Sequence, residues 1–159
     1  MDSKNRRDVK MKFDEDRLNH SVSVARKMVE IAKKMGLNEA SQKELFILGF
    51  NHDIGYEYDE NDEHGKVGGK MLRQSGYKYW KEIYYHGDIH PEYSSLYLDI
   101  LNSADMQVDK FGNDIGYEGR LSDIRSRYGE QSEVYKKCEV LVSLLKQKFN
   151  KEIEDVERD

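Results

Sequence analysis

The sequence has little cysteine or proline and no long apolar run. Cys138 is the only cysteine among 159 residues, so no disulfide can form within the chain and a reducing, cytoplasmic location is expected. It falls in the apolar stripe of the last predicted helix, where we expect a small core residue. No apolar stretch approaches the ~20 residues of a membrane span, and the N-terminus lacks the apolar segment of a signal peptide. Membrane association is therefore not expected.

Charged residues are abundant, but neither sign dominates. They make up 36% of the chain, against 37% apolar residues, and the formal net charge is −5. A protein that coats nucleic acid needs a basic surface, and no stripe of lysine and arginine stands out here. A small-molecule substrate with one or a few phosphates remains compatible with this charge, because a metal ion can supply positive charge locally.

Pro91 is the only proline, and the glycines fall mostly between segments of helical periodicity. Apolar residues three and four positions apart predict helices at residues 14–35, 38–53, 63–74, 78–86, 92–108, 120–127 and 132–149. Residues 110–118 are predicted as a loop, and no run alternates with a period of two. The prediction is a compact, all-α, multi-helix domain at 14–150, between a polar tail at 1–13 and a charged tail at 151–159.

Histidines and aspartates interrupt the apolar faces of these helices. His20 precedes Val24 and Met28 at helical spacing, and Asp105 stands four residues after Leu101. His52 follows Leu45, Leu48 and Gly49 at helical intervals, and Asp53 follows Phe46, Gly49 and Phe50 in the same way. His64 lies one turn before Val67, Gly68 and Met71, and His86 follows Ile83 by three. A carboxylate on an apolar face is costly to bury unless a charge or a metal ion compensates it.

Each of these residues also has a plain structural interpretation. His20 could bond the backbone, His64 could lie on the surface, and Asp105 could cap a turn or pair with a lysine. Together they favour a shared function, because imidazoles and carboxylates from several helices can hold divalent transition-metal ions. Gly49 and Gly68 would let helices approach closely beside them.

The order of these residues resembles the HD-domain superfamily of metal-dependent phosphohydrolases. Residues 49–55 read Gly-Phe-Asn-His-Asp-Ile-Gly, like that family's signature, and residues 64–72 read His-Gly-Lys-Val-Gly-Gly-Lys-Met-Leu, like its following helix. The resemblance covers residues 17–109 and implies a first ion held by His20, His52, Asp53 and Asp105. Asp53 would bridge to a second ion held by His64 and His86, as in dinuclear branches that include the YqeK-like proteins. His90 is a further metal or substrate contact in this scheme.

The resemblance implies hydrolysis of a small phosphate ester, with a nucleotide expected, by a hydroxide that bridges two ions. Iron is the first expectation, with manganese, nickel, cobalt and zinc as alternatives. Asp53 and His52 would be catalytic. The cations expected to contact the phosphate are Lys66, Lys70, Arg73 and Arg120. Arg120 is preferred because arginine can hold a phosphate through two parallel bonds, although a solvated surface charge is the plain alternative for each.

Two other functions fit the same residues. The ligand set also resembles HD-type diiron oxygenases, and a metal-containing module that senses a nucleotide without turnover is compatible with it. The chain has no Gly-Tyr-Pro motif, and Tyr56 follows Gly55, so a cyclic dinucleotide substrate is not expected. The acidic pair that follows His-Asp in (p)ppGpp hydrolases is missing as well. A homodimer through residues 14–35 or 132–149 remains open.

Overall fold

The structure, a computed structural model, describes residues 3–57 and 64–158. Within these ranges the chain forms seven α-helices and one 3-10 helix, and its only strand-like pairing is an isolated bridge between Val108 and Asp114. The prediction of an all-α protein is confirmed. The elements are α1 (Ser3–Lys34), α2 (Glu39–Asn51), η1 (Ile54–Glu57), α3 (His64–Gln74), α4 (Trp80–Tyr85), α5 (Leu96–Asp105), α6 (Gly116–Tyr128) and α7 (Glu133–Arg158).

Local side-chain caps determine where several helices begin. The Asn38 side chain accepts a hydrogen bond from the Ser41 amide at the start of α2. The Ser95 hydroxyl accepts from the Leu98 amide in the same way, so α5 begins at Leu96. The predicted start at residue 92 is therefore wrong, because the cap that organises this helix comes three residues later.

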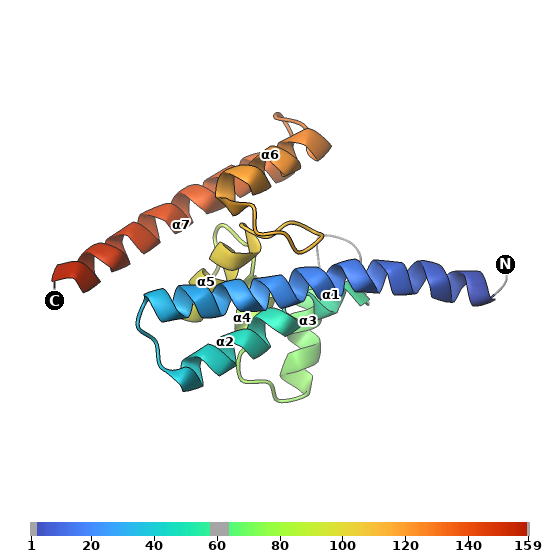
Figure 1. The fold of residues 1–159 in the computed structure, drawn as a ribbon, viewed down its shortest axis with the longest axis horizontal. Helices are drawn as coiled ribbons and strands as arrows, with labels where there is room; N and C mark the ends of the chain where they lie inside the picture. The colour runs from blue at the N-terminus through green and yellow to red at the C-terminus, as the bar shows by residue number, and fades with distance from the viewer. Residues whose placement is uncertain (1–2, 58–63, 159) are drawn as a thin grey trace.

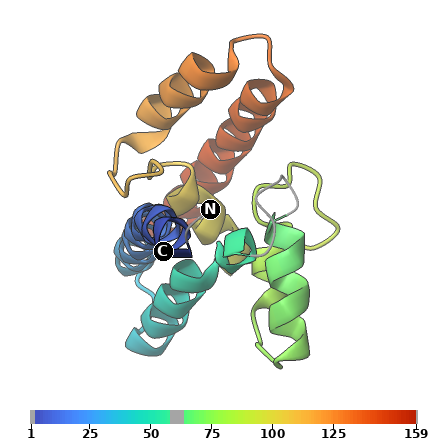
Figure 2. The same ribbon diagram turned by 90° about the vertical axis from the view of Figure 1, so that its right-hand side faces the viewer.

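Helix α5 lies at the centre of the fold, where it contacts α1, α2, α4 and α7. The long α1 packs along α2, while α3 pairs with α4 and with η1. Helices α6 and α7 form a separate antiparallel pair, as Figures 1 and 2 show. Among the described residues, no helix combines the length and apolarity needed to cross a membrane.

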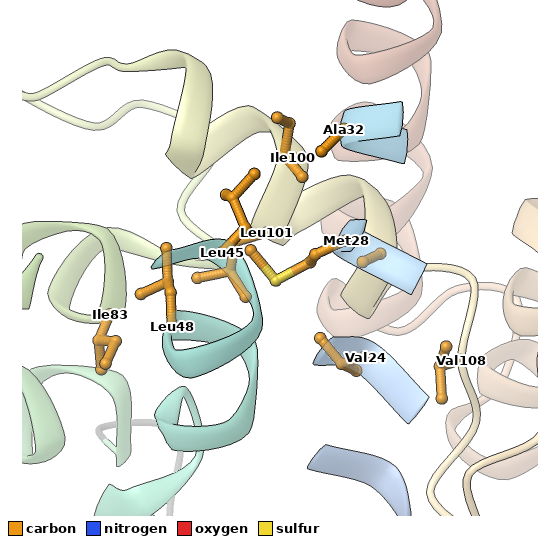
Figure 3. Close-up of a cluster of buried hydrophobic side chains, with 10 residues drawn as sticks. Val24, Met28, Ala32, Leu45, Leu48, Ile83, Ile100, Leu101 and Val108 are labelled. Carbon is orange, nitrogen blue, oxygen red and sulfur yellow. The ribbon is translucent and has the colours of Figure 1, made fainter. Parts of the chain in front are cut away.

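The main core lies where α1, α2, α4 and α5 meet (Figure 3). Val24, Met28 and Ala32 line the inner face of α1 and are fully buried, as are Leu45 and Leu48 of α2. Leu18, on another face of the same helix, is 50% exposed. His20 continues the buried face of Val24 and Met28, as its spacing predicted. A second apolar cluster joins α6 and α7 to the end of α5.

Several helix ends differ from the sequence-based prediction. Helix α1 begins at Ser3 and α7 ends at Arg158, so both predicted terminal tails are largely helical and project beyond the bundle (Figure 1). Neither terminal segment contains the proline or glycine that would stop a helix. Helix α6 begins at Gly116, within the predicted loop, and η1 was not expected. The predicted start at Glu63 lies outside the described residues.

Candidate metal centre

Six residues proposed as ligands converge from five helices. His20 comes from the middle of α1, and Asp105 is the last residue of α5. His52 is the C-cap of α2, with Asp53 directly after it. His64 is the first residue of α3, and His86 is the C-cap of α4. Five of the six stand at or beside a helix end, where the chain is free to turn a side chain toward a common point.

Asp53 lies at the middle of the cluster. Its Oδ2 is 3.4 Å from Nε2 of His20 and 3.2 Å from Nε2 of His52. Its Oδ1 is 3.4 Å from Nε2 of His64 and 3.7 Å from Nε2 of His86. The two oxygens of one carboxylate therefore face two different pairs of imidazoles.

Asp105 faces only the first of these pairs. Its Oδ1 lies 3.0 Å from Nε2 of His20 and 3.3 Å from Nε2 of His52. The cluster is thus divided into one group of atoms around Asp105 and another around Oδ1 of Asp53, with His52 between them. The centroid of the His52 ring lies 5.3 Å from that of the His20 ring and 5.4 Å from that of the His86 ring.

Three of the histidines share one hydrogen-bonding pattern. Nδ1 of His20 is 2.8 Å from the Asp109 carbonyl, Nδ1 of His52 is 2.6 Å from the Gly49 carbonyl, and Nδ1 of His86 is 2.5 Å from the Ile83 carbonyl. A carbonyl oxygen can only accept, so each Nδ1 carries the proton. In a neutral imidazole Nε2 is then the nitrogen with the lone pair, and in all three rings Nε2 points at the carboxylates.

A neutral Nε2 that faces carboxylate oxygens is repelled by them unless a proton or a metal cation lies between. The case is clearest for His52, which is fully buried. Its Nε2 has no hydrogen-bond partner among the described residues, although two carboxylate oxygens lie within 3.3 Å. These atoms surround a common point instead of meeting along a hydrogen bond. This is the arrangement that a divalent ion requires, and the donor set suits a transition metal.

The electrostatics of the cluster follow from the same geometry. Burial alone would lower the pKa of His52, but the charges of Asp53 and Asp105 outweigh it and raise this pKa well above its ordinary value. Burial disfavours ionised carboxylates, yet the imidazoles hold the pKa values of both Asp53 and Asp105 well below their ordinary range. The carboxylates are therefore ionised at neutral pH and provide the negative charge that a cation would need.

Two sets of ligand atoms are close enough to hold an ion. One consists of His20, His52 and Asp105, and the other of His52, Asp53 and His86, with the atoms of each set within 4.8 Å of one another. His64 belongs to neither set, although its Nε2 faces Asp53. His90 is exposed and belongs to neither set, and its backbone amide bonds the Asp88 carboxylate. The structure therefore does not bring His90 to the centre.

The four predicted phosphate contacts have different environments. Lys66, Lys70 and Arg73 are exposed on α3, and the Arg73 guanidinium lies 4.9 Å from the centre of the Trp80 ring. Arg120 on α6 is largely buried, with a side chain only 18% exposed. Its Nε has no hydrogen-bond partner within the part of the chain that the structure describes. Of the four, Arg120 is the least exposed to solvent, and its Nη1 lies 3.5 Å from Oδ2 of Asp123.

Glycines permit the close packing that brings these helices together. A Cβ on Gly49 would lie 2.7 Å from both Cα of Ala25 and Sδ of Met28, so α1 and α2 meet at this residue. A Cβ on Gly68 would lie 3.0 Å from the Gly55 nitrogen, beside the centre. The predicted role of Gly49 and Gly68 in close approach is confirmed.

The interpretation of Asp53 as part of a buried stripe is wrong, since Phe46 and Phe50 are exposed and Asp53 lies beyond the end of α2.

Sequence reasoning did not find the residues that support the ligands. The buried Asn102 accepts a hydrogen bond at 2.8 Å from the Gly87 amide, next to His86, and so ties the end of α4 to α5. The buried Glu82 accepts from the hydroxyls of Tyr93 and Ser95. These two residues could have been recognised in the sequence as polar residues within apolar helices. Asn102 stands three residues before Asp105, and Glu82 stands four before His86.

The fold and this centre define an all-α protein with a buried histidine and aspartate cluster suited to divalent ions. The family model of the HD domain matches residues 17–138. The chain therefore belongs to the HD-domain family, which is part of a superfamily of metal-dependent phosphohydrolases. Comparison with curated proteins and with solved structures found no match.

Proposed function

We propose that this protein is a metal-dependent phosphohydrolase that cleaves a small phosphate ester, with nucleotides as the first class of substrate to test. The observation that carries the proposal is the shared orientation of His20, His52 and His86. Each donates Nδ1–H to a backbone carbonyl and turns Nε2 toward the carboxylates. Outer hydrogen bonds of this kind are typical of histidines that ligate metals. Membership of the HD-domain family supports the reaction class.

In this proposal Asp53 serves two ion positions. Its Oδ2 faces His20 and His52, while its Oδ1 faces His64 and His86, which supports the assignment of His20, His52, Asp53 and Asp105 to one ion and of Asp53, His64 and His86 to another. Divalent ions at such a centre lower the pKa of water and offset charge on a phosphoryl group. Iron is proposed first, then manganese, nickel, cobalt or zinc. The YqeK-like ligand order, a cytoplasmic location and a homodimer stay predictions.

Arg120 is the proposed phosphate contact. Its weak ion pair with Asp123, at 3.5 Å, leaves most of its donors for a ligand, because Arg127 binds the same oxygen at 2.9 Å. Lys66, Lys70 and Arg73 lie on exposed positions of α3 and would contact only a substrate that extends along this helix. The Arg120 guanidinium can hold two phosphoryl oxygens at once.

The test is hydrolysis by protein loaded separately with Fe²⁺, Mn²⁺, Ni²⁺, Co²⁺ and Zn²⁺, measured by phosphate release and by chromatography of the nucleotide products. Substrates are nucleoside mono-, di- and triphosphates, dinucleoside polyphosphates and p-nitrophenyl phosphate. We expect metal-dependent hydrolysis that disappears in Asp53→Ala and Asp105→Asn. Asp99→Asn is the matched control on α5, because Asp99 forms a surface ion pair with Lys148 at 3.0 Å, and it should keep full activity. Full activity of Asp53→Ala would overturn the assignment.

Two outcomes would replace the proposal by an alternative. Activity that strictly requires dioxygen, with an iron signal that changes on addition of substrate, would indicate an oxygenase built on the same ligands. Tight nucleotide binding with no hydrolysis under any metal would indicate a sensing module. Ligand identity alone does not distinguish these functions, so turnover is the deciding measurement.

A further inference from the structure

The five-residue turn 109–113 after α5, here called the Asp109 turn, is built around the Asp109 side chain. Its Oδ1 accepts the amides of Phe111 and Asn113, each at 2.9 Å, and its Oδ2 accepts the Asn113 side-chain amide at 3.2 Å. The Asp109 amide donates to the Asn113 carbonyl at 2.9 Å, and the Gly112 amide to the Asp109 carbonyl at 3.1 Å. One carboxylate thus organises the whole turn and fixes where the Asp109 carbonyl points.

The turn and the residue after it, Asp114, are attached to α1 at three successive positions. Nδ1 of His20 donates to the Asp109 carbonyl at 2.8 Å, and the Ser23 hydroxyl donates to the Gly112 carbonyl at 2.6 Å. One turn further along α1, Lys27 pairs with Asp114 at 2.9 Å. Residues 20, 23 and 27 lie on one face of a helix. The His20 contact is therefore the first of a series, not an isolated bond.

Close backbone packing at Gly112 places the turn directly against α1. Gly112 has a φ of +90°, and a Cβ at this residue would lie 2.7 Å from the Asn19 carbonyl oxygen. A larger residue would have to push the turn away from α1. The position of the Asp109 carbonyl relative to His20 is thus determined both by the bonds inside the turn and by this contact.

We propose that Asp109 is a positioning residue for the metal centre, because its side chain shapes the turn whose carbonyl orients His20. The inference rests on the proposed function. With Nδ1–H held by the Asp109 carbonyl, His20 presents the Nε2 lone pair to the centre in a fixed ring orientation. Loss of such an outer partner typically weakens metal affinity by about 10- to 100-fold.

The first test measures zinc affinity by chelator competition in a double-mutant cycle. Asp109→Ala removes all three side-chain acceptor bonds and should weaken zinc binding by about 10- to 100-fold. Asp109→Asn keeps Oδ1 and should restore most of that affinity. In a His20→Ala background Asp109→Ala should cause no further loss, since the ring that it positions is gone. Asp114→Asn, which removes only the pair with Lys27, is the matched control and should bind zinc normally.

The second test does not depend on metal or on activity. Proton–nitrogen NMR of histidine side chains should show a slowly exchanging Nδ1–H at His20 in the unsubstituted protein. Asp109→Ala should speed its exchange, and Asp109→Asn should restore it. An unprotected Nδ1–H at His20, or one unchanged by Asp109→Ala, would overturn the inference. An equal loss of zinc affinity in both backgrounds would also overturn it, by showing a general effect on folding. If neither zinc nor any of the other four proposed metals binds, the proposed function fails, while the NMR test still decides the role of Asp109.

Discussion

Substitution of Arg120 by alanine tests the proposed phosphate contact. Arg120 carries its charge in a largely buried position, and Nη1 lies 3.5 Å from Asp123. Burial raises the pKa of the Cys138 thiol, while the Arg120 charge lowers it and the Asp105 charge raises it. The charges of Arg120 and Asp105 thus act on the same thiol in opposite directions.

The size of the effect follows from the bonds that Arg120 would make. Hydrogen bonds to charged groups contribute about 1.5–3 kcal/mol each. Loss of one such bond in the transition state corresponds to a fall of about 10- to 160-fold in kcat/KM, at 1.36 kcal/mol per factor of ten. Arg120→Lys keeps the charge but loses the paired geometry, so its kcat/KM should lie between those of the unsubstituted protein and Arg120→Ala.

Arg127→Ala is the matched control for this experiment. Arg127 lies on the same helix and binds the same Asp123 oxygen, at 2.9 Å, from an exposed position. Its removal should change kcat/KM by no more than about twofold, since surface substitutions usually alter free energies by less than about 0.5 kcal/mol. Steady-state kinetics on the best substrate, with melting temperatures measured in parallel, decide the matter. Equal kcat/KM values for folded Arg120→Ala and Arg127→Ala would refute the reasoning.

Three further predictions concern the ion positions and the core. His64→Ala should keep the fold and the ion at His20, His52 and Asp105 but contain about one ion fewer per chain by plasma mass spectrometry; an unchanged content would remove His64 from the ligand set. The charges of Asp53 and Asp105 raise the pKa of His52 well above its ordinary value, so an ion at Nε2 must compete with a proton for this nitrogen. Metal affinity should therefore fall as the pH is lowered, and calorimetry in two buffers should show proton release; no release at pH 7 would contradict the assignment. Gly49→Ala places a Cβ 2.7 Å from Ala25 and Met28 and should cost about 1–3 kcal/mol, lowering the melting temperature by about 2–12 °C; an unchanged melting temperature would contradict the close approach of α1 and α2.

Much of the fold could be predicted because helical periodicity depends on local spacing. The buried stripe of Val24 and Met28 and the cap at Asn38 are readable directly from the chain, and both are present. Helix ends were less predictable. Charged segments without glycine or proline have no local stop signal, so α1 and α7 extend beyond their predicted bounds. At α5, Ser95 and Glu92 are both acceptable starts in sequence, and only the bond from Leu98 selects Ser95.

The residues of the histidine and aspartate cluster were predictable for a different reason. A histidine or aspartate on an apolar helix face stands out against its neighbours, as His20 and Asp105 do. Residues that bind a histidine ring through a backbone carbonyl leave no such pattern in the sequence. The carbonyl of Asp109 meets His20 from 89 positions away, and only the folded chain shows that contact. Asp53 was assigned correctly to the cluster for an incorrect reason, since a turn beyond α2 delivers it and not a buried stripe.

Metal content per chain tests the central proposal most directly. The protein should be prepared without chelator and without a metal-binding tag, and analysed by plasma mass spectrometry beside the double variant His52→Ala/Asp53→Ala. We predict about two transition-metal ions per chain in the unsubstituted protein and a loss of most of this metal in the double variant. No bound metal, even after reconstitution with iron, manganese, nickel, cobalt and zinc, would contradict the account, since the buried imidazoles and carboxylates would then serve the structure alone.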